Sequence, residues 1–141
     1  ILTTESKPAK RGEVLLRQPL VWTGAPDGRA AQQRPLPLAF TRDCMFRPPA
    51  VKALNDAGID WFDAVDTLSE DAAYVSCAAD LGVRADLTSV SVRGVEPVHE
   101  HELPALPEYC VALYRATAGA DTEIADVFAA MLREVYAGSP G

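Results

Sequence analysis

The stretch FTRDCMFRPPAVKALNDAGIDW, residues 40–61, decides the fold class. It joins the apolar run LPLAF, residues 36–40, to a segment with apolar residues at helical spacing. Pro48 and Pro49 fall in the first helical turn, where a missing backbone N–H costs least. Gly58 is typical of the residue that follows a helix. The stretch therefore predicts a strand that passes into a helix.

The rest of the chain continues this alternation. Ser69, followed by two acidic residues, is a typical N-cap, and it predicts a helix over residues 69–82. Pro19 predicts a break or an edge in the strand at residues 13–24. The other strands are expected at residues 1–5, 36–40, 59–67, within 83–98 and at 108–116. A last helix at residues 121–138 has one apolar stripe: Ile124, Val127, Phe128, Met131, Leu132 and Val135. This order predicts an α/β fold with a mainly parallel sheet and helices over its faces.

The composition excludes several classes of protein. The chain has 141 residues, 48% hydrophobic and 23% charged, which fits one globular domain. No apolar run is long enough to span a membrane, and no export signal is visible. A net charge of −7 disfavours direct contact with DNA. Three cysteines, Cys44, Cys77 and Cys110, argue against a disulfide framework and for a cytoplasmic location. Because the sequence opens in an apolar stretch without Met, we expect a fragment.

Two strand-to-helix junctions are the candidate binding site. In open α/β sheets, ligands usually bind beyond the carboxyl ends of strands, and a helix start offers unpaired N–H groups to an anion. The junctions at residues 40–47 and 67–71 combine apolar, hydroxyl and guanidinium groups, which fits a small organic acid. The candidate residues are Cys44, Met45, Phe46, Arg47, Thr67, Leu68, Ser69 and Glu70.

Simpler interpretations of the same residues stay open. Ser69 can act as an N-cap alone, and Phe46 can be a packing residue at the start of its helix. Arg47 can lie on the solvated surface or pair with Asp43. The two prolines after Arg47 remove two of the donors that an anion would use.

An enzyme with Cys44 as its nucleophile is the alternative to a binding site at the first junction. The helix N-terminus and Arg47 would lower the pKa of the Cys44 thiol and activate it as a nucleophile. A nucleophile usually needs a base, however, and the only histidines, His99 and His101, lie far along the chain. These histidines and the neighbouring glutamates are a weak metal signal, and a solvated surface is the better interpretation. We therefore expect no catalytic residue, metal or cofactor.

Four blocks of the sequence resemble the effector-binding domain of LysR-type transcriptional regulators. The blocks are EVLLRQPLVW (13–22), LPLAFTRDCMFRPPAVKALNDAGIDW (36–61), TLSEDAAYVSCAADLGV (67–83) and LPALPEYCVALYR (103–115). Their order and spacing match the family over nearly the whole chain. Each motif alone is weak, and the combination is fairly specific.

The resemblance implies a periplasmic-binding-protein-like type 2 fold, here with one complete subdomain and part of the second. Residues 1–17 would end the first subdomain and cross over, residues 18–105 would form the second subdomain, and residues 106–141 would return to the first. In the family, the turns that match Cys44–Phe46 and Thr67–Glu70 help to line an effector cleft between the subdomains.

The implied function is that of a sensor that performs no chemistry. The chain would bind a small effector, and DNA would be contacted only through an N-terminal helix-turn-helix that is absent from this sequence, as is the first half of the first subdomain. A dimer or tetramer is implied. The alternative is a solute-binding protein of the periplasmic type. One departure from the family is VRAD, residues 83–86, where an apolar run is common. Arg84 and Asp86 there predict an edge strand or an altered surface.

Overall fold

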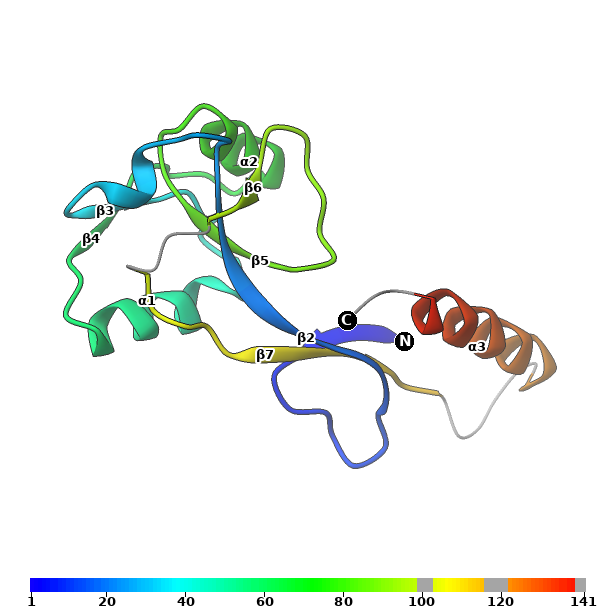
Figure 1. Ribbon diagram of the computed structural model, residues 1–141. Helices are drawn as coiled ribbons and strands as arrows, with labels where there is room; N and C mark the ends of the chain where they lie inside the picture. The colour runs from blue at the N-terminus through cyan, green and yellow to red at the C-terminus, as the bar shows by residue number, and fades with distance from the viewer. Residues whose placement is uncertain (99–102, 116–121, 139–141) are drawn as a thin grey trace. The chain divides into compact units, whose positions relative to one another are not determined.

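The computed structural model describes residues 1–98, 103–115 and 122–138 and divides the chain into two compact units (Figure 1). Unit 1 comprises Ile1–Pro19 and Glu108–Gly141, and unit 2 comprises Leu20–Pro107. Strand β2 (Glu13–Gly24) contributes residues to both units.

Unit 1 is built on an antiparallel arrangement of three strands. β7 (Glu108–Leu113) pairs with β1 (Leu2–Glu5) and with the first part of β2. The Tyr114 hydroxyl donates to Glu5 Oε1 at 2.6 Å and accepts the Ala9 N–H at 2.7 Å. The side chain that follows β7 therefore ties the start of the chain to this sheet.

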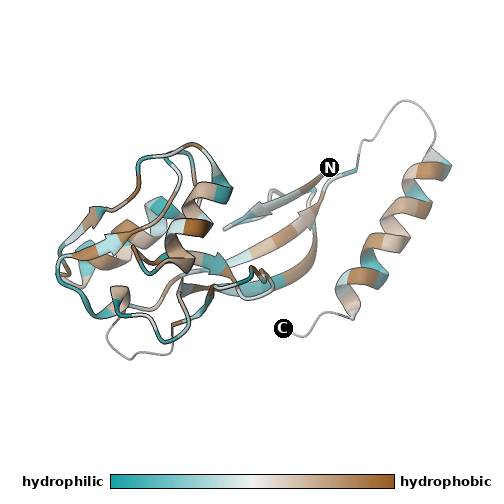
Figure 2. Cartoon of the chain, turned by 90° about the horizontal axis from the view of Figure 1, so that it is seen from above, coloured by the Kyte–Doolittle hydropathy of each residue, from teal (hydrophilic) through white to brown (hydrophobic). Residues whose placement is uncertain are grey.

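The last helix, α3 (Thr122–Ala137), forms where the sequence predicts it. Figure 2 shows hydrophobic residues recurring along α3. The guanidinium of Arg133, in α3, makes a bidentate ion pair with the Glu13 carboxylate, and both N–O distances are 2.7 Å. Ala129 is buried. Most of the apolar stripe stays 58–66% exposed, however: Ile124, Val127, Phe128, Met131 and Val135.

Unit 2 contains the strand-to-helix junctions. Its elements are the last part of β2, the 3₁₀ turn η1 (Ala30–Gln32), β3 (Leu36–Leu38), α1 (Arg47–Asp56), β4 (Trp61–Asp63), α2 (Glu70–Ala78), β5 (Arg84–Leu87) and β6 (Glu96–Pro97). Figure 1 shows α1 and α2 on either side of the strands.

The prediction of a mainly parallel sheet is wrong. Among the described strands, only β3 and β4 form a parallel pair, and a single parallel bridge joins Leu38 to Val83 just before β5. The pairs β1–β7, β2–β7, β2–β5 and β2–β6 are antiparallel. Among the described elements, strands and α-helices alternate only from β3 to β5. The chain enters unit 2 along β2 and returns to unit 1 at Glu108, where β7 begins. β2 and β7 pair with each other and run in opposite directions.

Pro19 does not break β2, so the break, one of the two predicted alternatives, is wrong. It is the last residue of β2 that is paired with β7, where it lies opposite Glu108. The next residue, Leu20, is the first that is paired with β5, opposite Leu87. The missing N–H of proline therefore falls where the strand changes its partner.

The core of unit 2 lies between α1 and one face of the strands. Ala50 and Leu54 of α1 are fully buried against Leu36 and Leu38 of β3 and against Trp22. α1 ends as predicted, because Gly58 adopts φ +67°. The amides of Gly58 and Ile59 then donate to the carbonyls of Asn55 and Leu54, which is the Schellman pattern of a helix end.

α2 ends earlier than the predicted residue 82. Its last helical residue is Ala78, and the left-handed position is occupied by Asp80, with φ +59°. The Asp80 carboxylate accepts the N–H groups of Arg29 and Ala30 at 2.8 and 2.9 Å. These bonds stabilise a conformation that favours glycine. Gly82 has a different role, since a Cβ there would lie 3.1 Å from the Pro37 carbonyl oxygen.

We expect Leu54→Ala to lower the free energy of unfolding of unit 2 by about 2–5 kcal/mol, because the fully buried side chain leaves a cavity. Urea titration with tryptophan fluorescence measures this, since both tryptophans, Trp22 and Trp61, lie in unit 2. Leu81→Ala is the matched control, because Leu81 is 58% exposed. Equal losses in the two variants would contradict this account of the core.

Candidate functional site

The two predicted junctions lie next to each other at one edge of unit 2. The Arg42 N–H, after β3, donates to the Thr67 carbonyl, after β4, at 3.0 Å. The Thr41 hydroxyl donates to Glu70 Oε1, also at 3.0 Å. The parallel pairing of β3 with β4 explains this contact, because the carboxyl ends of parallel strands meet at the same edge. The eight candidate residues therefore belong to two contacting turns, and ligand binding by them stays a prediction.

The first turn is closed by its own backbone. The Cys44 N–H donates to the Thr41 carbonyl at 3.2 Å, and the Arg47 N–H donates to the Cys44 carbonyl at 3.1 Å. Phe46 is the N-cap residue of α1 and packs, partly buried, against the core together with Cys44, as its packing interpretation predicts. Met45 is 47% exposed. The turn thus presents one thioether to solvent, next to a half-buried aromatic ring.

The charge of Arg47 is already paired. Its guanidinium lies 2.7 Å from the Asp63 carboxylate and 5.3 Å from the centroid of the Trp61 ring. The predicted alternative partner was Asp43, and the observed partner is the residue that ends β4. A cavity of about 300 Å³ lies here, lined by Phe40, Arg42, Arg47, Asp63, Val65 and Asp66.

The second turn confirms the capping role of Ser69. Its hydroxyl oxygen accepts the Ala72 N–H at 3.3 Å, which satisfies one of the free donors at the start of α2. Its own N–H donates to Thr67 Oγ1 at 3.0 Å. Leu68, between them, is 67% exposed. The hydroxyl groups of this turn therefore shape the helix start, and Glu70 is the residue that connects it to the interior.

Arg84 and Asp86 are buried, so the prediction of an altered surface is wrong, although β5 does stand last in the strand order of its sheet, as the edge alternative predicts. Each residue is only 2% exposed. β5 alternates, so Ala85 belongs to the core under α1, while Arg84 and Asp86 point to the opposite face, under α2. The physical reason is that the two charges neutralise each other inside the fold, with Arg84 Nε 3.2 Å from Asp86 Oδ1.

The Arg84 guanidinium is the centre of a polar cluster under α2. Its Nη2 donates to Glu70 Oε2 at 3.0 Å, and its Cζ lies 3.7 Å from the centroid of the Tyr74 ring. Asp86 accepts the Tyr74 hydroxyl at 2.9 Å and the Thr23 hydroxyl at 2.7 Å. Burial works to lower the pKa of Arg84, but Asp86, Tyr74 and Glu70 together raise it, so the guanidinium stays charged. Burial, followed by the charge of Asp86, also raises the pKa of Tyr74.

The sequence alone does not predict this cluster. The available signal is a pair of opposite charges at positions i and i+2 of a short strand, flanked by Val83, Ala85 and Leu87. Side chains two residues apart in a strand lie on the same face, so such a pair can neutralise itself when that face is covered.

Cys44 is not an activated thiol. Burial raises its pKa, and the N–H groups of Phe46 and Arg47 together with the charge of Arg84 oppose this only in part. The prediction that the helix start and Arg47 would lower its pKa is therefore wrong in its net direction. His99 and His101 lie outside the described residues. Within the described part of the chain, no group of three or more His, Cys, Asp or Glu residues is placed to hold a metal ion.

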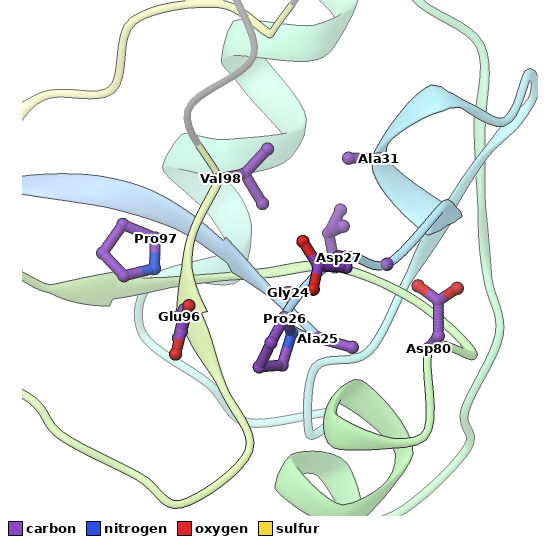
Figure 3. A pocket seen from close by; sticks show the side chains of 11 residues that line it. Gly24, Ala25, Pro26, Asp27, Ala31, Asp80, Glu96, Pro97 and Val98 are labelled. Atoms are coloured by element: carbon purple, nitrogen blue, oxygen red, sulfur yellow. The ribbon is translucent and has the colours of Figure 1, made fainter.

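A second hollow lies on another part of unit 2. This cavity has a volume of about 210 Å³. In Figure 3, Asp27, Asp80 and Glu96 lie around it, and Val98 is part of its lining. None of the eight candidate residues lines it. Its three carboxylates disfavour an organic acid, and Asp80 is already engaged with the start of η1.

Among the described helices, none is long and apolar enough to cross a bilayer.

Comparison with known proteins identifies the fold. No family model and no curated protein sequence matches the chain. Among solved structures, the regulatory domain of Synechocystis PCC6803 CcmR in complex with 2-PG matches with a TM-score of 0.63 at 18% identity, over 99% of this chain and 75% of that one. A mutant of the HypT regulatory domain from Salmonella typhimurium matches with 0.62 at 15% identity, over 91% and 68%. HinK, a LysR family transcriptional regulator from Pseudomonas aeruginosa, matches with 0.62 at 17% identity, over 96% and 48%.

These likenesses confirm the predicted fold class. The chain has the α/β, periplasmic-binding-protein-like type 2 fold of LysR-type effector-binding domains. It spans about half of the longer chain of HinK. At these identities the comparison concerns the fold alone.

We expect iodoacetamide to alkylate Cys44 at pH 7 more slowly than it alkylates N-acetylcysteine. The raised pKa keeps the thiol protonated at neutral pH, and the rate should climb only as the pH rises above the usual thiol range. Mass spectrometry of the labelled peptide measures the rate, and Cys44→Ser identifies the peptide. Burial raises the pKa of Cys77 to about 12, so this thiol should react even more slowly. Rapid labelling of Cys44 at pH 7 would contradict this expectation and support an enzyme with Cys44 as its nucleophile.

We expect Asp86→Asn to lower the free energy of unfolding of unit 2 by about 3 kcal/mol or more, because it leaves the buried Arg84 without its buried charge partner. Urea titration with tryptophan fluorescence measures the loss. Asp66→Asn is the matched control, since it removes the same charge from the exposed pair with Arg42 and should change stability little. A loss no larger than that of the control would contradict the role of the cluster.

Proposed function

We propose that this chain is the effector-sensing domain of a LysR-type transcriptional regulator, and that its two contacting turns form one wall of the effector site. The observation that carries this proposal is the direct contact of the turns, through Arg42 to Thr67 and through Thr41 to Glu70, within the matching fold. The wall consists of the eight candidate residues: Cys44, Met45, Phe46, Arg47, Thr67, Leu68, Ser69 and Glu70.

The wall is suited to recognition without reaction. The thiol of Cys44 is held protonated, and the hydroxyl of Ser69 is engaged in capping. Met45 and Phe46 offer an apolar surface beside the polar start of α2. A small organic acid with an apolar body matches this combination. CcmR, with the same fold, has been solved in complex with 2-PG, which supports a small-molecule effector.

In the proposed mechanism, the effector shifts an equilibrium between conformations of the regulator. Its differential affinity for the two states sets the size of the shift. The chain would act as a dimer or tetramer in the cytoplasm, and DNA would be contacted by a helix-turn-helix outside this sequence. We assign residues 18–105 to the second regulatory subdomain, and residues 1–17 and 106–141 to the first.

The coding sequence upstream of Ile1 tests the class of protein. A helix-turn-helix in frame supports the regulator. An export signal in that position would instead favour the solute-binding protein, which shares the fold.

We expect the double variant Phe46→Ala, Ser69→Ala to weaken effector affinity at least about tenfold, about 1.4 kcal/mol, in the complete regulator, while its oligomeric state persists. The apolar contact and the ordered start of α2 are both lost in this variant. Isothermal titration measures the affinity, and sedimentation measures the oligomer.

The control for this test is Phe62→Ala with Ser76→Ala, which removes the same groups from β4 and from a later turn of α2. Affinity that is unchanged in the first variant, or equally reduced in both, would contradict the placement of the site.

A further inference from the structure

The buried guanidinium of Arg84 has one nitrogen without a hydrogen-bond partner. This nitrogen is Nη1, and among the described residues it is the one buried side-chain nitrogen or oxygen without a hydrogen-bond partner. The side chain is 2% exposed, so water does not cover this group from outside. Buried donors in folded proteins are nearly always paired, and an orphan is therefore a sign of strain or of a missing partner.

One of the two carboxylates that neutralise Arg84 is fixed. Asp86 is 3% exposed at its side chain. Both of its oxygens are occupied, since Oδ1 accepts from Tyr74 and from Arg84 Nε, and Oδ2 accepts from Thr23. Asp86 therefore holds the guanidinium in place and keeps it charged.

The other carboxylate is replaceable. The Glu70 side chain is 51% exposed and lies in the first turn of α2. One oxygen accepts from Thr41 and the other from Arg84 Nη2. Glu70 thus reaches only one of the two terminal nitrogens of Arg84, and rotation of its half-exposed side chain into solvent would free Nη2.

We propose that an oxyanion of the effector, a carboxylate or a phosphate, displaces Glu70 and binds both terminal nitrogens of Arg84 together with the Thr41 hydroxyl. This inference rests on the proposed function and names the chemical class of the effector. The exchange preserves charge, because one anion leaves the guanidinium as another arrives.

The geometry favours the incoming anion over Glu70. Two parallel N–H···O bonds from the guanidinium fork are stronger and more directional than the single bond that Glu70 accepts from Arg84. The site lies where the two turns meet, since Thr41 precedes the first turn and Glu70 opens α2. Opposing effects of Arg84 and Glu70 on the pKa of Cys44 agree with their closeness to the first turn.

Glu70→Gln tests the exchange. Glutamine keeps a similar shape and an acceptor for Arg84 or Thr41 but removes the competing charge. In NMR titrations of the ¹⁵N-labelled chain with sodium phosphate, and separately with sodium formate, we expect at least tenfold tighter binding to this variant. Shifts should be largest at the Arg84 side-chain N–H signals, with sodium chloride of equal ionic strength as the reference.

Asp66→Asn is the matched control. It removes an equal negative charge from the same edge of unit 2, where Asp66 pairs with Arg42. We expect no more than a twofold change in anion affinity for this variant. Arg84→Lys, with its fold checked by tryptophan fluorescence, should bind both anions at least tenfold more weakly than the parent chain.

Three results would overturn the proposal: equal tightening in Glu70→Gln and Asp66→Asn, no binding of either anion to Glu70→Gln, or unchanged binding in Arg84→Lys. A preference for formate would favour a carboxylate as the effector group, and a preference for phosphate would favour a phosphate. The proposed function is tested separately by the Phe46 and Ser69 variant, so a loss there with no effect of Glu70→Gln leaves a sensor whose effector is not anchored by an anion.

Discussion

Burial of the Arg84 charge is the constraint on which the organisation of unit 2 depends. A guanidinium removed from water is costly unless carboxylates and hydrogen-bond acceptors surround it. Here Asp86 supplies the internal charge from the same strand, and Tyr74 and Glu70 supply a ring and a second carboxylate from α2. These contacts fix the rotation of α2 over β5. Through Glu70, which bonds both Arg84 and Thr41, they also connect the first turn of α2 to the end of β3.

The two faces of the strands in unit 2 are consequently stabilised in different ways. Under α1, the contacts are apolar and involve Leu54, Leu38 and Trp22. Under α2, small buried residues, Ala73 and Cys77, accompany the polar cluster. Apolar packing tolerates small adjustments of position, whereas a buried polar network loses free energy when one member is unpaired. Specificity in the arrangement of the turns therefore comes from the polar face.

Local signals in the sequence predicted much of this fold. The prolines that open α1, the left-handed Gly58 that closes it and the Ser69 cap act over a few residues, and each lies where it was predicted. Strand direction was not predictable in this way, because the partners in β2 and β7 are far apart in the sequence, from Pro19 opposite Glu108 to Glu13 opposite Leu113. The end of α2 was misplaced because the left-handed residue is Asp80, and its stabilising partners, Arg29 and Ala30, are fifty residues away.

The candidate site shows the same division. The two turns were predicted from strand order, and their contact follows from the parallel pairing of β3 with β4. The buried cluster escaped prediction because an Arg and an Asp in one strand are most often exposed, and only the position of α2 shows that their face is covered. Likewise, the pairing of Arg47 with Asp63 depends on where β4 ends relative to the start of α1.

The charges at this edge bear on how a ligand could be recognised. Arg42 is paired with Asp66, Arg47 with Asp63, and Arg84 with both Asp86 and Glu70. An anionic effector would therefore meet cations that already have carboxylate partners, and it would bind by exchange with one of them. Binding by exchange gains little from the sign of the charge alone, because an internal carboxylate provides the same charge. It gains from shape and from the number of hydrogen bonds, and Arg84, with a free nitrogen, is the cation at which a better-fitting anion has most to gain. On this argument the edge would discriminate among small anions by geometry more than by charge.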